Sequence, residues 1–293
     1  MIDEEIDYKS EKAEVRDSVE HYLEQRFLRY PDTEVRQVAQ YVALGGGHRW
    51  RPIVAVASGR IFHRDALKIG LPGACGVELA HAASLILDDL PSMDDAALRR
   101  GKPCAHLVFP RWAVDMAPVF LVTMAYDISL NNERVPEERR VRAALSLSSA
   151  GLAMIEGQCL DLASDVLDGS SDGLLDCYTL KSAALYGAAA RAGAIICGAD
   201  HEDADRLERT GHYLGLSYQF MDDVADVTAT ADQVGKEVGK DLGKFTSTDW
   251  LGVNGAVEKS RTYQTLALKE LKKFGPEADW LRSIVCEASW ATH

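Results

Sequence analysis

The feature that most constrains the fold is the spacing of apolar residues, which recur mostly every three and four positions. Alanine-rich runs such as VELAHAASLIL at 77–87, VRAALSLSSAGLAMIEG at 141–157 and LKSAALYGAAARAGAIICG at 180–198 have this helical pattern. Alternating strand patterns are scarce. Breaks are expected at Gly- or Pro-containing segments, including LPGA at 71–74 and VNGAV at 253–257, without a long linker. The sequence therefore predicts one all-α domain, residues 1–293, of roughly ten or more helices.

Composition and charge narrow the class of protein. With 47% hydrophobic and 26% charged residues, the 293-residue chain has the composition of a soluble globular protein. Its net charge of −13 argues against a nucleic-acid partner, because phosphate binding along a strand requires excess Lys and Arg. The acidic first residues do not resemble a secretory signal, and we find no apolar window long enough to span a bilayer. We therefore expect a cytoplasmic protein.

Cysteine usage agrees with a reducing compartment. The six cysteines are scattered without any CxxC pair, and most lie among apolar neighbours. We interpret them as reduced, packed thiols rather than as a disulfide framework or a zinc site.

A first acidic cluster follows an apolar run in SLILDDLPSMDDAALRRGKP, residues 84–103. Asp88, Asp89, Asp94 and Asp95 come directly after sequence typical of a buried core, and three cations follow them. Mutual repulsion and lost hydration make this arrangement costly unless cations neutralise the carboxylates. The cluster therefore indicates a site that works with bound cations.

A second acidic cluster lies in GLSYQFMDDVADVTAT, residues 215–230. Asp222, Asp223 and Asp226 stand at i, i+1 and i+4, which places Asp222 and Asp226 on one helical face. A lone DDxxD motif is more often a solvated acidic face, but the apolar flanks and the first cluster favour a binding role. Paired carboxylates that leave coordination positions open suit Mg²⁺, which keeps waters and is shared with substrate phosphates.

Basic residues that could complete such a site recur in short segments. They are His48, Arg49 and Arg51 in GGGHRWRP, Arg99 and Arg100 in LRRGKP, Lys181 in TLKSAA, and Lys236, Lys240 and Lys244 in VGKEVGKDLGK. Each alone is more often a surface charge. Together with two acidic clusters they predict a pocket for two diphosphates.

In this order the motifs resemble those of the trans-isoprenyl diphosphate synthases, which join isopentenyl diphosphate to an allylic diphosphate. GGHRWRP resembles the family's GGKRxRP, DDLPSMDD with LRRGKP its first aspartate-rich motif, GQCLDL its GQxxDL, LKSAALY its KT segment, YQFMDDVADV its second motif, and VGKDLGK its lysine tail. The resemblance extends over nearly the whole chain. It implies an all-α bundle around a deep central cavity, with the two aspartate-rich helix ends facing each other across its mouth, and a homodimer.

The resemblance also implies roles for individual residues. The family's three Mg²⁺ ions would be held by Asp88, Asp89, Asp94, Asp222, Asp223 and Asp226, and these aspartates other than Asp226, with Lys181, would be the catalytic residues. The allylic diphosphate would be bound by Arg99, Lys181, Ser182, Gln219, Lys236 and Lys244, and isopentenyl diphosphate by His48, Arg49, Arg51, His81 and Arg100. The implied reaction is ionisation of the allylic diphosphate, followed by addition of the isopentenyl double bond to the carbocation.

Two positions depart from the family pattern. His48 stands where the family usually has Lys, and it is mostly neutral at pH 7 unless a phosphate raises its pKa. Leu87 stands where the family often has His, just before the first Asp pair.

Product length depends on the residues just before the first acidic cluster. Ala83 and Ser84 lie one helical turn before Asp88, with Ala80 a turn deeper, and all three are small. Relatives that stop at the fifteen-carbon product commonly have an aromatic residue at one of the first two positions. We therefore expect the twenty-carbon product, geranylgeranyl diphosphate, although Met124 or Tyr126 could shorten the pocket.

Three alternatives stay open at this point. The chain could be a farnesyl diphosphate synthase, a terpene cyclase of the same fold, or a non-catalytic partner subunit of a synthase. The cations assigned to isopentenyl diphosphate argue against a cyclase, and the presence of both acidic clusters argues against a non-catalytic subunit.

Overall fold

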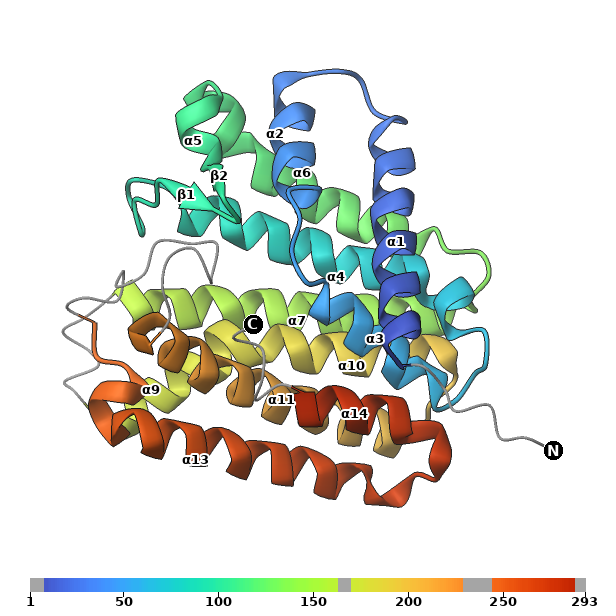
Figure 1. Ribbon diagram of the computed structural model, residues 1–293. Coiled ribbons are helices and arrows are strands. Elements are labelled where there is room, and N and C mark those ends of the chain that lie inside the picture. The colour runs from blue at the N-terminus through green and yellow to red at the C-terminus, as the bar shows by residue number, and fades with distance from the viewer. Residues whose placement is uncertain (1–7, 163–169, 229–243, 288–293) are drawn as a thin grey trace.

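The computed structural model describes residues 8–162, 170–228 and 244–287, and these are almost wholly helical (Figure 1). The helices are α1 (Tyr8–Phe27), α2 (Glu34–Ala43), α3 (Trp50–Arg60), α4 (Ala66–Asp88), α5 (Ala105–Val108), α6 (Arg111–Leu130), α7 (Glu137–Leu162), α9 (Ser171–Cys177), the π-helical turn η1 (Tyr178–Ala183), α10 (Ala184–Cys197), α11 (His201–Thr228), α13 (Ser247–Glu270), the 3₁₀ turns η2 (Leu271–Lys273) and η3 (Pro276–Ala278), and α14 (Asp279–Glu287). Two strands of two residues each, β1 (Leu98–Arg99) and β2 (Lys102–Pro103), pair in antiparallel orientation and form a small hairpin. The predicted all-α bundle is confirmed.

Helix α10 forms the centre of the bundle. Every residue in it except Arg191 is buried, and it packs against α3, α4, α7 and α11. A Cβ on Gly193 would lie 1.9 Å from the carbonyl oxygen of Ala55 in α3, so only glycine permits this approach. The small residues of the alanine-rich run therefore allow helices to pack closely on all sides.

The other helices are arranged in layers around α10. Helix α4 lies between α10 and α6, while α11 lies between α10 and α13 (Figure 1). One apolar core extends from α1 to α14, and a second, smaller core lies between η1, α11 and α13. This arrangement leaves the ends of α4 and α11 near the segment that begins α13. The single-domain interpretation stays a prediction.

Two predicted helix breaks are wrong in detail. The LPGA segment does not end a helix, because α4 continues through Pro72. Proline removes the N–H that would bond to the Lys68 carbonyl, and Arg134 Nη1 donates to that carbonyl at 3.0 Å instead. The break expected at VNGAV is a kink inside α13 at Gly252, which has φ of 68°. In α4 the contact from Arg134 therefore compensates for the local breaking signal.

Among the described residues, helices α4 and α6 are long and apolar enough to cross a membrane by length and composition. Neither is an uninterrupted apolar segment of that length, because α4 contains Glu78 and α6 contains Asp115 and Asp127. The expectation that the protein spans no membrane stays a prediction. Of the most apolar window, 67% is buried inside the bundle in α4 and 44% in α6. Packing against α10 accounts for the apolar character of α4.

The cysteines agree with the prediction of packed thiols. None of the six forms a disulfide, and four of them, Cys75, Cys104, Cys177 and Cys197, are buried. Cys159 and Cys286 are exposed.

Candidate active site

A cavity of about 1240 Å³ opens among α3, α4, α6, α7, η1, α10, α11 and the start of α13. The predicted site residues that line it are His48, Arg49, Arg51, Ala80, His81, Ala83, Ser84, Asp88, Asp94, Arg99, Arg100, Lys181, Ser182, Gln219, Asp222, Asp223, Asp226 and Lys244. Asp89 lies beside the cavity without lining it, and Lys236 lies outside the described residues, as does Lys240. Residues from distant segments of the chain therefore meet in one place, as the motifs predicted.

The first acidic cluster lies where α4 ends. Burial raises the pKa of Asp88 to about 6, and Asp94 and Asp89 add to this effect against the opposing charges of Lys181 and Arg99. Asp89 is 5% exposed and accepts hydrogen bonds from Arg99 Nε at 2.8 Å and Nη2 at 2.6 Å. Asp88 and Asp94 thus face the cavity, while Asp89 orients Arg99. A metal role for Asp89 stays a prediction.

The backbone around the mouth adopts an unusual conformation at three non-glycine residues. Arg49, Asp95 and Arg100 have φ of 56°, 46° and 54°. Left-handed backbone costs free energy for such residues and is concentrated at functional sites, where surrounding contacts impose it. Arg100 is held there by donating to the Gly46 carbonyl.

Two lysines converge on one carboxylate, that of Asp161. Lys181 Nζ lies 2.6 Å and Lys244 Nζ 3.0 Å from Asp161 Oδ2, and Lys244 Nζ also lies 3.3 Å from Asp94 Oδ1. Burial acts to raise the pKa of Asp161, but the two lysines outweigh burial and hold it below its usual value. Asp161 thus fixes both cations at the cavity mouth, where an anionic ligand could take them over.

Lys181 reaches Asp161 because η1 approaches α7 closely. A Cβ on Gly157 in α7 would lie 2.3 Å from the Lys181 backbone nitrogen, so glycine is required at this crossing. The π-helical turn itself is a rare geometry that often marks a functional site. Gly157 and Asp161 both belong to the GQCLDL segment, so this motif supplies the close crossing and the carboxylate together.

The second acidic cluster divides into two parts. Asp222 and Asp226 line the cavity from one face of α11, as the i, i+4 spacing predicted. Asp223 is 3% exposed and accepts from Tyr178, Ser247 and Gln219. Burial raises the pKa of Asp223, although these hydrogen bonds act against that rise. Asp223 is therefore fully engaged with protein groups.

Arginines and two neutral histidines form the opposite wall. Arg51 lies with its guanidinium carbon 4.4 Å from the centroid of the Tyr186 ring. Burial, followed by the charges of Arg51 and Arg100, lowers the pKa of His81 well below its usual value. His48 is exposed at the mouth, and desolvation by the surrounding chain, followed by Arg16 and Arg100, lowers its pKa too. This wall is therefore suited to a strongly anionic ligand.

Arg49 differs from the other predicted ligands of isopentenyl diphosphate. It is 2% exposed, donates through Nη1 to Glu78 Oε1 at 2.7 Å, and forms an ion pair with Glu20. Removing either partner of a buried pair leaves an uncompensated charge. The structure therefore gives Arg49 a role in joining α1, α3 and α4 beside the site.

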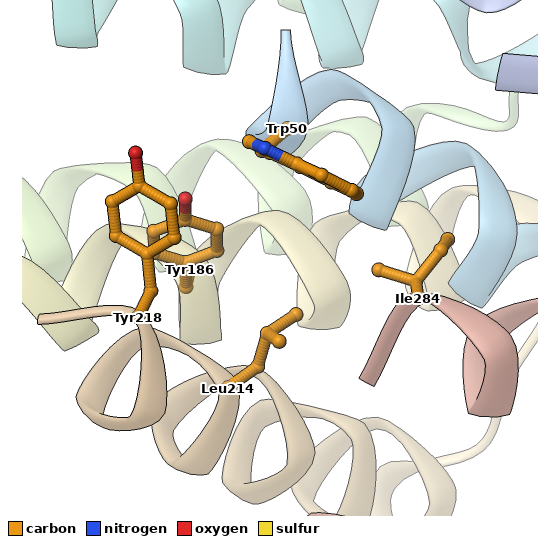
Figure 2. A pocket seen from close by; sticks show the side chains of 5 residues that line it. All are labelled: Trp50, Tyr186, Leu214, Tyr218 and Ile284. Atoms are coloured by element: carbon orange, nitrogen blue, oxygen red, sulfur yellow. The ribbon is translucent and has the colours of Figure 1, made fainter. Parts of the chain in front are cut away.

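A small apolar cavity lies next to the wall of arginines and histidines (Figure 2). It measures about 10 Å³, the size of one water probe, and is lined by Trp50, Tyr186, Leu214, Tyr218 and Ile284. In Figure 2 the hydroxyl groups of Tyr186 and Tyr218 point the same way, with Leu214 and Ile284 on the other side. The packing places the Tyr186 ring where it supports Arg51.

The part of the cavity between α4, α6 and α7 is mainly apolar. Ala80, Ala83 and Ser84 of α4 line it together with side chains of α6 and α7 such as Val119 and Ile155, which are exposed. Tyr126 also lines it, whereas Met124 is 2% exposed in the core and does not. Of the two residues that could shorten the pocket, only Tyr126 is placed to do so.

Four contributors to the site were not among the predicted residues: Glu78, Asp161, Tyr178 and Tyr186. Asp161 could have been found, because it is the one charged residue of the GQCLDL segment and lies between two leucines, where a carboxylate needs a partner. The other three are identified only by their contacts across the fold.

Comparison with known proteins agrees with this arrangement. The family model described as polyprenyl synthetase matches residues 32–281. The chain belongs to the polyprenyl synthetase family. This polyprenyl synthetase is 36% identical over 244 residues to geranylgeranyl pyrophosphate synthase 10, mitochondrial, of Arabidopsis thaliana, covering 80% of this chain and 70% of the relative. It is 32% identical over 284 residues to the geranylgeranyl diphosphate synthase of Cyanophora paradoxa, covering 93% and 92%.

Solved structures of prenyl synthases have a similar fold. An FPP/GFPP synthase from Zymomonas mobilis is 28% identical, with a TM-score of 0.81 over 97% of this chain and 99% of that one. A geranyltransferase from Helicobacter pylori, solved with magnesium and isoprenyl diphosphate, is 25% identical, with a TM-score of 0.85 over 97% of both chains. The polyprenyl synthetase described here is accordingly a prenyltransferase.

Proposed function

We propose that this prenyltransferase uses Mg²⁺ to add isopentenyl diphosphate to allylic diphosphates and releases geranylgeranyl diphosphate. The observation that carries the proposal is one cavity in which two acidic clusters and two groups of cations surround the mouth while small residues line the depth. A terpene cyclase would not need the second group of cations. A non-catalytic subunit would not need both acidic clusters.

The carboxylates at the mouth fit Mg²⁺. Asp88, Asp94, Asp222 and Asp226 offer hard oxygen ligands around one opening. Burial raises the pKa of Asp88, and a cation bound beside this carboxylate would offset that cost. Among the described residues, no three His, Cys, Asp or Glu side chains stand close enough together to hold a metal ion by themselves. Substrate oxygens would therefore complete the coordination. Bound there, Mg²⁺ would neutralise charge on the leaving diphosphate.

The chain's own cations supply the remaining neutralisation. Arg99, Lys181 and Lys244 would bind the allylic diphosphate, leaving their present partners Asp89 and Asp161. Arg51 and Arg100, with His48 and His81, would hold isopentenyl diphosphate on the opposite wall. The apolar depth then keeps water from the carbocation while the isopentenyl double bond attacks.

Product length follows from the depth of the cavity below Asp88. Ala80, Ala83 and Ser84 leave room for a chain to descend along α4. The plant and algal relatives named above are geranylgeranyl diphosphate synthases, which supports a twenty-carbon product. A fifteen-carbon product is the second candidate, because Tyr126 lines the cavity and could act as a floor.

Product analysis tests the proposal directly. The purified protein is incubated with Mg²⁺, isopentenyl diphosphate and each of dimethylallyl, geranyl and farnesyl diphosphates, and the dephosphorylated products are sized. We expect geranylgeraniol from all three substrates and no product when EDTA replaces Mg²⁺. Cyclic hydrocarbons formed without isopentenyl diphosphate would indicate a cyclase, and absence of any product would indicate a partner subunit.

We also propose that the protein is a homodimer that pairs through α6 and α7. Six large apolar side chains on these two helices are more than half exposed: Trp112, Met116, Val119, Leu145, Leu152 and Ile155. A stable interface buries ~800 Å² per partner, and these six side chains would supply apolar area to it. Val119, Leu152 and Ile155 line the cavity as well, so a second copy would close its wall.

Light scattering after size exclusion tests the dimer. We expect twice the chain mass for the wild type, and a shift to monomer for Leu152→Glu, which places a charge in the apolar face. Lys259→Glu on α13 is the matched control and should stay dimeric. A monomeric wild type at micromolar concentration would contradict the proposal. The expected cytoplasmic location and lack of a nucleic-acid partner stay predictions.

A further inference from the structure

We propose that Asp223 is a positioning residue that holds Lys181 and Lys244 at the diphosphate site, and that it is not a metal ligand. The inference deepens the proposed function, since it concerns the same site. Its main measurement, however, does not depend on the identity of the product.

The first argument is that most acceptor positions of the Asp223 carboxylate are engaged by protein donors. Oδ1 accepts from Gln219 Nε2 at 2.9 Å. Oδ2 accepts from the Tyr178 hydroxyl, from the Ser247 backbone N–H at 3.1 Å and from Ser247 Oγ at 2.5 Å. Of the about four acceptor positions of an ionised carboxylate, those of Oδ2 are filled and Oδ1 keeps one, which leaves little capacity for a metal ion. Asp223 is also 3% exposed.

The second argument is where the donors lie along the chain. Tyr178 begins η1 three residues before Lys181, and Ser247 begins α13 three residues after Lys244. The two segments also meet directly, because the Ser247 N–H lies 3.1 Å from the Tyr178 hydroxyl. Asp223 therefore binds Tyr178 and Ser247, which lie near the two lysines in sequence, while Asp161 binds the lysines themselves. The two carboxylates thus connect η1 to the segment that begins α13 at two separate points.

A third contact makes the connection between η1 and α11 rigid. Ser182 Oγ donates to Gln219 Oε1 at 2.6 Å, and Gln219 donates in turn to Asp223. Lys181 is therefore flanked by two hydrogen-bonded residues that both lead to Asp223. The negative charge also lies at the N-terminus of α13, where the helix dipole stabilises it.

Kinetics of three variants test the inference. Asp223→Asn, Tyr178→Phe and Ser247→Ala should each raise KM for the allylic diphosphate about tenfold. KM for isopentenyl diphosphate and the Mg²⁺ concentration giving half-maximal activity should change less than twofold. Because the residues act as one unit, Asp223→Asn combined with Tyr178→Phe should be no worse than Asp223→Asn alone.

Two further variants provide controls. Ser260→Ala removes another buried hydroxyl contact between α11 and α13, that of Ser217 with Ser260, and should lower Tm without changing KM for the allylic substrate. Asp222→Asn should raise the Mg²⁺ requirement. A purely structural role for Asp223 would make its variants behave like Ser260→Ala.

The proposal is overturned if Asp223→Asn raises the Mg²⁺ requirement as Asp222→Asn does. It is also overturned if Tyr178→Phe and Ser247→Ala keep the wild-type KM, which decides the matter even if Asp223→Asn does not fold. Activity of the wild type without any divalent cation would contradict the proposed use of Mg²⁺, but the allylic KM values would still test Asp223.

Discussion

Lys181 and Asp161 form an ion pair inside the cavity, with the lysine Nζ 2.6 Å from the carboxylate Oδ2. Lys181 belongs to η1 and Asp161 to α7, and Lys244 binds the same oxygen. A diphosphate that enters the mouth offers both lysines a more highly charged partner. The ion pair therefore keeps these cations in place before substrate binds.

Asp161→Asn should make the free protein less stable and its response to diphosphate larger. The pKa of Asp161 is held below its usual value, so its stabilising effect is present above the unfolded pKa and is lost as pH falls. In metal-free buffer at pH 7 we expect a Tm lower by several degrees, and a larger rise in Tm on adding inorganic diphosphate. Asp176→Asn, at an exposed position in α9, is the control and should match the wild type.

Asp88→Asn should stabilise the metal-free protein in a pH-dependent way. Burial raises the pKa of Asp88 from 3.8 to about 6, so ionisation of this side chain destabilises the fold as pH rises through that range. A shift of this size corresponds to about 3 kcal/mol. Thermal melts should show no gain in stability for the variant at pH 4 and the full gain at pH 8.

Replacing an aspartate of either cluster by alanine should nearly abolish catalysis. Asp88→Ala and Asp222→Ala should each reduce turnover by several orders of magnitude in steady-state assays, while Tm holds or rises. Near-full activity of either variant at saturating Mg²⁺ would show that its carboxylate does not bind the metal.

His48→Lys should lower KM for isopentenyl diphosphate. Desolvation together with Arg16 and Arg100 lowers the pKa of His48, so the imidazole is neutral at and above its usual pKa of about 6.5. A lysine there adds a permanent cation, and the gain should extend over pH 6.5 to 9 rather than appear chiefly above pH 7. KM for the allylic substrate should barely change. Equal changes in both KM values would show that His48 does not bind isopentenyl diphosphate specifically.

The sequence predicted the helices because helix formation depends on local patterns, and it predicted the meeting of the motifs through their resemblance to a known family. Alanine-rich spacing indicates α10, and the i, i+4 spacing of Asp222 and Asp226 places both on the cavity face. Contacts between distant residues could not be predicted in this way. Asp223 meets Tyr178 across 45 residues and Ser247 across 24, and Arg49 meets Glu78 across 29.

The depth of the cavity was only partly predictable for the same reason. The small residues before Asp88 indicate the upper wall, because helical periodicity fixes their position relative to the aspartate. Whether Met124 or Tyr126 faces that wall depends on how α6 packs against α4. The structure places Met124 in the core and Tyr126 at the cavity.

Product length in the Ala83→Tyr variant shows whether the growing chain descends along α4 below Asp88. Ala83 is 3% exposed and lines the cavity, so a tyrosine ring there would block the path just below the site of ionisation. Assayed beside the wild type with dimethylallyl diphosphate, the variant should release farnesyl diphosphate where the wild type releases geranylgeranyl diphosphate. A wild type that already stops at fifteen carbons, or a variant with unchanged product length, would contradict the account.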